Sequence, residues 1–251
     1  MKTVYKYRRF GLIGFVFSLA GLSRAQDNWT GMTIVRVKPD MIVRWRDVYK
    51  TEIIPAYKKA GVQSFAVWRT IPFGNSYEFT LMMPIKNFAQ FDGEVSPGRG
   101  MMPQGRLRTP AELDKYVIHS ESLALLALPE VSSEKAGAPP PQLVIVQTVT
   151  VLPKNISTYL NFLKEDMKPV VQKAGVDFWY VYRHVFGSLT NQITSLRSLQ
   201  NYAELDMGPL AARILSPEEA NTLAAKDNQL VESSRLVIAK YDSELSYSKP
   251  R

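Results

Sequence analysis

Apolar positions in the first part of the chain follow two different periods, and each period predicts a different element. Residues 32–38 are rich in branched side chains, alternate in part, and are closed by a proline, which is typical of a β-strand. Between residues 41 and 57, apolar side chains return every three or four positions, which predicts a helix. Pro55 lies inside this helical pattern, so we expect a kink or a break near Ile54. Gly61 follows in a position that suits the end of the helix.

The next segment predicts a hairpin, a loop, a helix and a fourth strand. Residues 64–71 and 77–83 are rich in aromatic and branched side chains and flank a Phe-Gly-Asn turn. Residues 92–108 contain repeated Gly and Pro breaks without periodicity, which is typical of a loop. A capping-box sequence at residues 109–112 predicts a helix to about residue 120, and residues 122–128 predict a strand.

The second half of the chain repeats this order at a spacing of 114 residues. Lys-Ala-Gly-Val occurs at residues 59–62 and again at residues 173–176, and eight of the 21 positions from 49 to 69 are identical at this spacing. The same elements are therefore expected again, with strands at residues 143–152, 177–186, 189–195 and 235–241, and helices at residues 155–174 and from the capping box at 216–219 to about residue 231. This pattern indicates a tandem duplication.

Each copy has the order β-α-β-β-α-β, the ferredoxin-like plan, in which helices cover one face of an antiparallel sheet. The other face needs a cover, which a tandem copy supplies if the two sheets meet face to face. The sequence therefore predicts an α+β fold in which two ferredoxin-like repeats, residues 30–131 and 142–251, pack sheet to sheet as an intramolecular α/β barrel. Residues 132–141, with three consecutive prolines, are the expected linker. Two independent domains are the alternative.

The first 25 residues have the pattern of a secretory signal peptide. Basic residues precede an apolar run of 12 residues, and Ser23 and Ala25 are small residues at the −3 and −1 positions before Gln26. A retained N-terminal anchor is the alternative. The pattern predicts export to the periplasm or to the outside of the cell, and the absence of cysteine is more typical of a bacterial envelope protein than of a small disulfide-bonded module.

Removal of the signal peptide changes the charge balance. It takes away five cations and no anions, which lowers the formal net charge from +8 to +3, and no dense Lys/Arg block follows. Nucleic acid is therefore not an expected partner. No segment after the signal approaches the ~20 apolar residues of a membrane-spanning helix. A homo-oligomer beyond the internal pseudo-dimer is left open.

The strong signatures of catalysis are absent from the sequence. Without cysteine there is no thiolate nucleophile and no Cys metal site. The two histidines, His119 and His184, cannot form an HExxH motif or a three-histidine site, and the common glycine-rich and nucleophile motifs do not occur. We therefore predict no metal and no cofactor from the residues alone.

His184 is the first candidate for a binding or catalytic role. A period of two places one set of side chains on the same strand face: Phe178, Tyr180, Tyr182, His184 and Phe186. This aromatic wall could line a pocket for a flat ligand, with the histidine as acid, base or axial ligand. The alternative is an inert, hydrogen-bonded histidine at the rim of a core. The duplicated position holds Thr70, so at most one copy would use it.

Arg69 and Arg183 are the second candidate, because they occupy equivalent positions in strands of aromatic and branched residues. A guanidinium there could bind an anionic ligand, or form a structural ion pair with Glu52 or Asp166 on the preceding helix. Further aromatic residues at matched positions could line a pocket between helix and sheet or simply fill the core: Trp45, Trp68, Tyr159 and Tyr182.

The order of these elements resembles the NIPSNAP family of the dimeric α/β-barrel superfamily. The features that carry the resemblance are a helix with an internal proline, a Lys-x-x-Gly-type exit, an aromatic strand ending in Trp68-Arg69, a hairpin and an Asn-aromatic-Ala segment. They span residues 33–92 and 147–206. The superfamily includes small monooxygenases, haem-dependent chlorite dismutases and dye-decolourising peroxidases, and the NIPSNAP resemblance brings no shared catalytic residue.

Together, the signal-peptide pattern, the aromatic strand positions and the resemblance predict an exported NIPSNAP-like protein of undefined activity that binds a small hydrophobic or aromatic ligand. The residues expected near that ligand are His184, Arg183, Tyr182, Tyr180, Arg69 and Trp68. A monooxygenase-type oxidoreductase is the alternative, and a haem protein with His119 as proximal ligand is a third hypothesis. Whether the protein is an enzyme stays open at this point.

Overall fold

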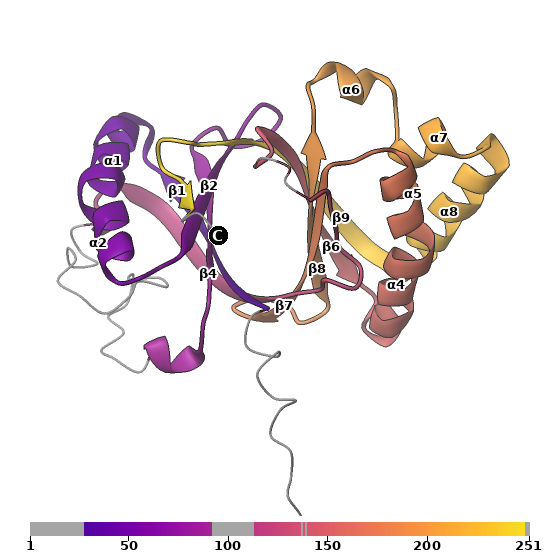
Figure 1. The fold of residues 1–251 in the computed structure, drawn as a ribbon, viewed down its shortest axis with the longest axis horizontal. Coiled ribbons are helices and arrows are strands. Elements are labelled where there is room, and N and C mark those ends of the chain that lie inside the picture. Colours follow the sequence, from indigo (N-terminus) through magenta and orange to yellow (C-terminus); the bar gives the residue numbers. More distant parts are fainter. Residues whose placement is uncertain (1–27, 92–112, 137, 139, 249–251) are drawn as a thin grey trace, which may run out of the picture.

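The fold is described from a computed structural model, which places residues 28–91, 113–136, 138 and 140–248. Within these residues, ten antiparallel strands form one sheet with helices on its outer side (Figure 1). The expected signal peptide, the long loop and the first capping box lie outside the described residues. No helix among the described residues is both long and apolar enough to cross a membrane.

The first half of the chain contains four strands and one long, segmented helix. Strand β1 (Trp29–Val37) leads through a 3-10 turn (Pro39–Met41) into α1 (Ile42–Val48), a π-helical turn (Tyr49–Ile53) and α2 (Ile54–Lys59). Then follow β2 (Ser64–Thr70), β3 (Glu78–Pro84), a 3-10 turn (Phe88–Phe91) and β4 (Val117–Ala127).

The second half repeats this order and adds further helices. After the short β5 (Ser133–Glu134), it consists of β6 (Leu143–Val151), a 3-10 turn (Pro153–Asn155), α4 (Ile156–Phe162), a π-helical turn (Leu163–Met167), α5 (Lys168–Lys173), β7 (Phe178–Phe186), β8 (Gln192–Leu199), α6 (Ala203–Asp206), α7 (Leu210–Ile214), α8 (Pro217–Leu230), β9 (Val231–Tyr241) and β10 (Tyr247–Ser248). Both ends of β9 lie 114 residues after the ends of β4.

The prolines inside the two long helices do not end them. Pro55 and Pro169 each lie at the start of the helical segment that follows a π-helical turn. Proline lacks a backbone donor and its ring crowds the carbonyl four residues before it, and a π-turn relieves both by changing the hydrogen-bond spacing. The helix therefore continues through Ile54, where we expected a kink or a break. It ends as predicted before Gly61, which adopts a φ of +79°.

The structure corrects two local predictions, the start of the fourth strand and the unstructured linker, and confirms a third, the second capping box. Strand β4 starts at Val117, so His119 lies exposed on a strand opposite Arg36 and not near the end of a helix. The expected linker contains β5, which pairs with β7. The second capping box is formed: Ser216 Oγ accepts from the Glu219 N–H, and the Ser216 N–H donates to the Glu219 carboxylate.

The strand order joins the two halves at both of their edges. The order is β10-β2-β3-β1-β4-β7-β8-β6-β9, and β9 also pairs with β2. Leu125 of β4 lies opposite His184 of β7, and Arg69 of β2 lies opposite Lys240 of β9. Backbone hydrogen bonds thus connect the halves edge to edge, a connection that the face-to-face expectation did not include.

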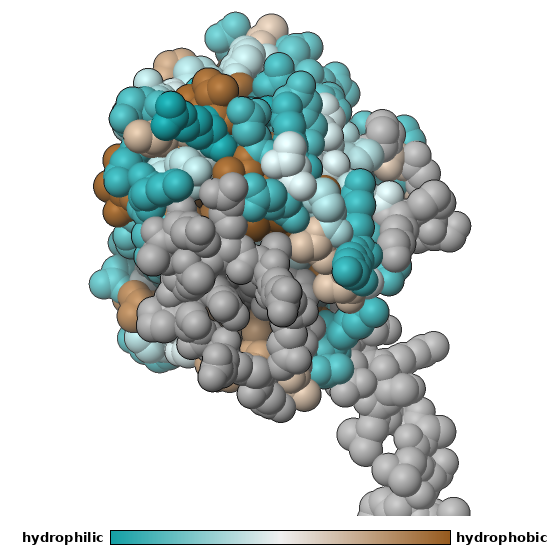
Figure 2. Space-filling view, turned by 90° about the vertical axis from the view of Figure 1, so that its left-hand side faces the viewer, coloured by the Kyte–Doolittle hydropathy of each residue, from teal (hydrophilic) through white to brown (hydrophobic). Residues whose placement is uncertain are grey.

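Apolar side chains form three layers around this sheet. An inner layer takes side chains from both halves, including Trp68, Leu125, Tyr182 and Leu196. One outer layer lies under α1 and α2, and the other under α4, α5 and α8. Figure 2 views the molecule from the side of α1 and α2 and shows a largely hydrophilic surface with a few hydrophobic patches.

Candidate functional site

Strand β7 alternates between the inner and outer layers, as its sequence predicted. Phe178, Tyr180 and Tyr182 contact the inner layer, whereas Trp179 and Val181 face the helices of the second half. The period-two reading of this strand is therefore confirmed as a statement about faces. It also means that three members of the aromatic wall, Phe178, Tyr180 and Tyr182, belong to an apolar core that both halves share, whereas Phe186 is exposed.

The six residues expected near a ligand do not form one site. Trp68 and Tyr182 are buried in the inner layer, and Tyr180 donates a hydrogen bond to Glu134. On β2, Arg69 Nε donates to the Ser76 carbonyl oxygen at 2.8 Å, and the guanidinium lies 6.0 Å from the centre of the Phe79 ring. These contacts give Arg69 a structural role.

Arg183 does not contact the acidic residue that we considered as its partner. Asp166 pairs with Lys226 at 3.1 Å instead. His184 lines a cavity on the inner face of the sheet, and neither Arg69 nor Arg183 lines that cavity.

The inner cavity has a volume of about 290 Å³ and borders the inner apolar layer at Met32 and Leu123. Strands of both halves line it. His184 is buried there and has both ring nitrogens occupied: Nδ1 lies 2.5 Å from Ser188 Oγ, and Nε2 lies 2.7 Å from Thr194 Oγ1. Burial lowers the pKa of His184 to about 4, so the ring is neutral at pH 7.

An ionic cluster lies beside this histidine. Glu78 is buried and pairs with Arg36 at 3.3 Å and with Arg235 at 3.2 Å. Arg235 belongs to β9, whereas Glu78 belongs to β3 and Arg36 to β1. The Arg235–Glu78 ion pair therefore joins the two halves of the chain, beyond the end of β2. A buried carboxylate with two cationic partners is well compensated.

A larger cavity of about 430 Å³ lies on the outer side of the second half, between the sheet and the helices. Its walls come from β6, β7 and β8 on one side and from α4, α5, α7 and α8 on the other. Most of its lining side chains are apolar, among them Phe162, Leu163, Val171, Trp179, Ile193 and Leu223. We call it the outer cavity.

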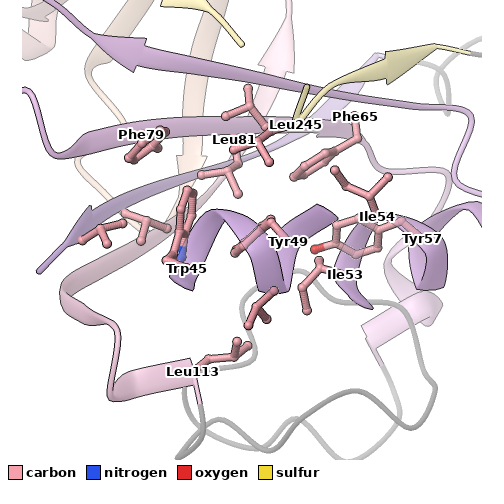
Figure 3. Packing of buried hydrophobic residues seen from close by; sticks show 14 of the residues in the cluster. Trp45, Tyr49, Ile53, Ile54, Tyr57, Phe65, Phe79, Leu81, Leu113 and Leu245 are labelled. Atoms are coloured by element: carbon pink, nitrogen blue, oxygen red, sulfur yellow. The ribbon is translucent and has the colours of Figure 1, made fainter. Parts of the chain in front are cut away.

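The outer cavity exists because the second copy has smaller side chains than the first. In the first half, aromatic rings fill the corresponding layer (Figure 3). Five of them, Trp45, Tyr49, Tyr57, Phe65 and Phe79, correspond at the 114-residue spacing to Tyr159, Leu163, Val171, Trp179 and Ile193. Side chains that are mostly smaller, on the same backbone plan, leave space that no other residue fills.

Few polar groups face the outer cavity. Tyr159 is almost fully buried and Asp227 is half-buried, and burial raises the pKa of both groups. Arg197 also lines the cavity, but its charge is met by Glu204 at 3.1 Å, which Arg213 contacts at the same distance. Among the described residues, none hydrogen-bonds to the Tyr159 hydroxyl or the Asp227 carboxylate, so these two groups are available to a ligand.

Neither cavity fits a histidine-held haem or a metal ion. Haem iron in proteins is held by His, Cys, Met or Tyr side chains. His119 is exposed on β4, His184 is hydrogen-bonded through both nitrogens in the smaller cavity, and neither lines the outer cavity. Among the placed residues, no group of three or more His, Asp or Glu side chains could hold a metal ion.

Comparison with known proteins places the chain by its fold. No family model and no curated protein matches its sequence. Three solved structures share the architecture. A candidate monooxygenase from Lactobacillus acidophilus has 12% identity and a TM-score of 0.55, and the match covers 86% of this chain and 95% of that one. An anthrone oxidase-like protein has 12% identity and a TM-score of 0.59, with 90% and 95% covered.

The third is a mutant chlorite dismutase from Candidatus Nitrospira defluvii, with 8% identity, a TM-score of 0.54, and 90% and 96% of the two chains covered. At these identities the likeness concerns the fold alone. The chain is a mixed α/β protein with a large antiparallel sheet, and its structural neighbours belong to the dimeric α/β-barrel superfamily that the sequence resembles.

Sequence reasoning missed most of the outer cavity. Only Tyr159 was considered, as one of four matched aromatic residues. The signal that would have found the cavity is the loss of ring volume from the first copy to the second, at positions such as Phe79 and Ile193. The identities between the copies drew attention, whereas the differences in side-chain size determine where space remains.

Proposed function

We propose that this protein binds a small apolar or aromatic molecule in the outer cavity of its second half. The observation that carries the proposal is the 430 Å³ space in this layer, at positions where the described residues under α1 and α2 bury mostly larger aromatic rings. Protein interiors are close-packed, and voids larger than a few water molecules are rare. A cavity of this size with mainly apolar walls falls within the range of ligand pockets.

The polar groups of the cavity would orient the ligand. Tyr159 and Asp227 face a mainly apolar space, and a buried polar group without a partner is unfavourable. A ligand with one hydrogen-bonding group would therefore be favoured over a plain hydrocarbon. Arg197 is already engaged in an ion pair with Glu204, a carboxylate that it shares with Arg213.

We also propose that the chain is a NIPSNAP-like tandem duplicate whose two ferredoxin-like repeats form an intramolecular α/β barrel. The strand pairings that join the halves at both edges support this, as do the matching element order and the inner layer that both halves supply. The signal-peptide pattern supports export to the periplasm or beyond.

The alternative is a monooxygenase-type oxidoreductase that acts on the bound molecule. Likeness in fold to a candidate monooxygenase and an anthrone oxidase-like protein favours this alternative in kind only. The acid–base groups available in the outer cavity are Tyr159 and Asp227, whereas His184, Arg183 and Tyr182 do not line it. The roles that we expected for those three residues therefore do not transfer to this cavity.

Binding of a neutral fluorescent probe tests the proposal. N-phenyl-1-naphthylamine should fluoresce when it enters the outer cavity of the purified protein lacking residues 1–25. Ala220→Trp, which places an indole at a partly buried wall of α8, should reduce probe affinity at least tenfold. Ala225→Trp is the matched control, because Ala225 lies on the same helix, exposed and outside the lining. Equal binding by both variants would disprove the assignment.

Two further measurements separate binding from catalysis. Bound aromatic molecules should be recovered unchanged after incubation in air, and an oxygenated product that disappears in Asp227→Asn would support the oxidoreductase instead. A visible spectrum with added haem should show no Soret band that depends on His184, since neither histidine is placed to hold the iron. Such a band in the wild type but not in His184→Ala would favour a haem protein.

A further inference from the structure

The inner cavity is a second space that the proposed function does not use. It lies on the opposite face of the sheet from the outer cavity, and the two share no lining residue. On β6, for example, Thr148 faces the inner cavity and Val149 the outer one. The two cavities can therefore hold different ligands.

The second copy has built a hydrogen-bonding unit where the first has none. His184 and Ser188 correspond, at the 114-residue spacing, to Thr70 and Gly74. A Cβ atom at Gly74 would lie 2.5 Å from the Thr70 methyl group, so the first copy has no room for a serine there. The His184–Ser188 contact of 2.5 Å is thus a joint feature of two positions that both differ between the copies.

His184 belongs to a chain of four hydrogen-bonding side chains. Ser188 contacts His184, His184 contacts Thr194, and Thr194 contacts Thr148 at 2.8 Å. A neutral imidazole donates from one nitrogen and accepts at the other. If Nε2 carries the proton, the bonds run from Ser188 towards Thr148, whose hydroxyl proton is then free; with the other tautomer, the proton of Ser188 is free. With either tautomer, the four hydrogen-bonded side chains offer the cavity one donor and spare acceptor oxygens.

The charged groups around the cavity sum to no net charge, and one of them, Glu121, is free to contact a ligand. Glu78 is neutralised by Arg36 and Arg235. Glu121 is the positional counterpart of Arg235, but it faces the cavity and forms no ion pair or side-chain hydrogen bond with the residues that the structure describes. Two carboxylates and two guanidinium groups give no net charge, so neither an anion nor a cation is strongly favoured.

We propose that the inner cavity binds a neutral polyhydroxylated molecule of about the size of a monosaccharide. Hydroxyl groups both donate and accept, which matches the Ser188–His184–Thr194–Thr148 chain in either direction. A carboxylate such as Glu121 accepts from ligand hydroxyls, and the amide of Gln192, also in the lining, does both. Apolar residues on the wall, such as Met32, suit the C–H face of a sugar ring. The volume of 290 Å³ equals that of about ten water molecules in the liquid, which a hexose can replace.

Ligand-detected saturation-transfer NMR and calorimetry on the same protein lacking residues 1–25 test this site. The probes are D-glucose, D-galactose, D-mannose and myo-inositol, with glucuronate and glucosamine as charged comparisons. At least one neutral probe should bind saturably and more tightly than both charged sugars. Glu121→Gln and Thr194→Val should each weaken that binding at least tenfold. The first replaces one accepting carboxylate oxygen by an amide donor and removes the charge, and the second interrupts the row of hydrogen bonds without a change in shape.

The controls keep the test decisive. Thr222→Val removes an exposed hydroxyl on α8 that bonds only to a helix carbonyl, and should leave sugar binding unchanged. If Thr194→Val does not fold, Glu121→Gln decides, since no described contact depends on that carboxylate. The proposal is overturned if no neutral probe binds and the cavity holds water only, if a charged sugar binds best, or if Glu121→Gln binds like the wild type. Ala220→Trp should leave sugar binding intact, so failure of this site and failure of the outer cavity are distinguishable.

Discussion

The two outer layers of the molecule show what duplication can do to a fold. Both consist of a π-turned helix packed on the outer face of a four-stranded half. In the first half, the centre of the Trp45 ring lies 4.3 Å from that of Tyr49 and 4.5 Å from that of Phe79, and these rings pack in the layer (Figure 3). In the second half, the same plan encloses 430 Å³. One copy therefore has the packing that stabilises a domain, and the other has space for a ligand.

This contrast implies that the two layers contribute unequally to stability. Dispersion and burial depend on neighbours at contact distance, and a side chain that borders a void loses part of both. Additional segments compensate in each half. Leu245 and Tyr247 from the C-terminal segment pack on the first layer, and α7 and α8 cover the second.

The largest expected effect is the loss of Trp45. We expect Trp45→Ala to lower the free energy of unfolding by about 3–5 kcal/mol, because it leaves a void in a filled core. Tyr159→Ala, at the equivalent position, should cost only about 2 kcal/mol, since that side chain already borders empty volume. Urea denaturation of both variants gives the comparison. Equal losses would mean that the second layer is as tightly packed as the first.

Most of the fold was predictable because its signals are local. Periodicity located the strands, and the glycines after both long helices were expected to adopt positive φ, as Gly61 and Gly175 do. The π-helical turns were not predicted, because proline alone indicates a disturbance and not its form. The start of β4 was missed because the helix that we expected to precede it was extended too far, over residues that pair with β1.

The candidate sites were harder to predict because they depend on what side chains do not fill. His184 was singled out correctly as a point of divergence, but its partners Ser188 and Thr194 come from a turn and from the next strand. Their convergence depends on the register of β7 and β8, which the sequence does not specify to the residue. Arg69 and Arg183 are a repeated pair, and the structure gives Arg69 contacts to the Ser76 carbonyl oxygen and the Phe79 ring.

The turn between β2 and β3 and the equivalent turn between β7 and β8 provide a second comparison of the two halves. Gly187 has a φ of +89°, and a Cβ atom there would lie 2.3 Å from the Ser122 carbonyl oxygen. We expect Gly187→Ala to cost about 3 kcal/mol. Its counterpart Phe73 has a φ of +55° although it is not glycine, so Phe73→Gly should stabilise by about 0.5–1 kcal/mol. Thermal unfolding measures both, and a destabilised Phe73→Gly would contradict the inferred strain.

Protonation of the buried His184 should make the free energy of unfolding depend on pH. Because the folded-state pKa of His184 is about 4, the unfolded chain binds a proton below about pH 6.5 that the folded chain does not bind until about pH 4. Stability should therefore fall by about 2–3 kcal/mol as pH decreases through this window, and be fully present above it. His184→Gln should remove this component.

Exchange of one residue between the layers tests the comparison most directly. Phe79 and Ile193 are equivalent and both fully buried, one in the filled layer and one at the wall of the outer cavity. We expect Phe79→Ile to destabilise by about 1–2 kcal/mol, because a void opens among rings that cannot move into it.

Ile193→Phe should change stability by less than about 0.5 kcal/mol, because the extra ring enters existing space and does not overpack the core. It should also abolish binding of the naphthylamine probe, whereas Phe79→Ile should leave probe binding unchanged. The two sites lie in separate layers, so the double exchange should show the sum of the single effects on stability. If Ile193→Phe destabilised the protein as much as Phe79→Ile does, the second layer would be a core without room for a ligand. Two results together would attribute the difference between the two layers to the volume of this side chain. Phe79→Ile would lose stability, and Ile193→Phe would keep its stability while the new ring occupies the outer cavity.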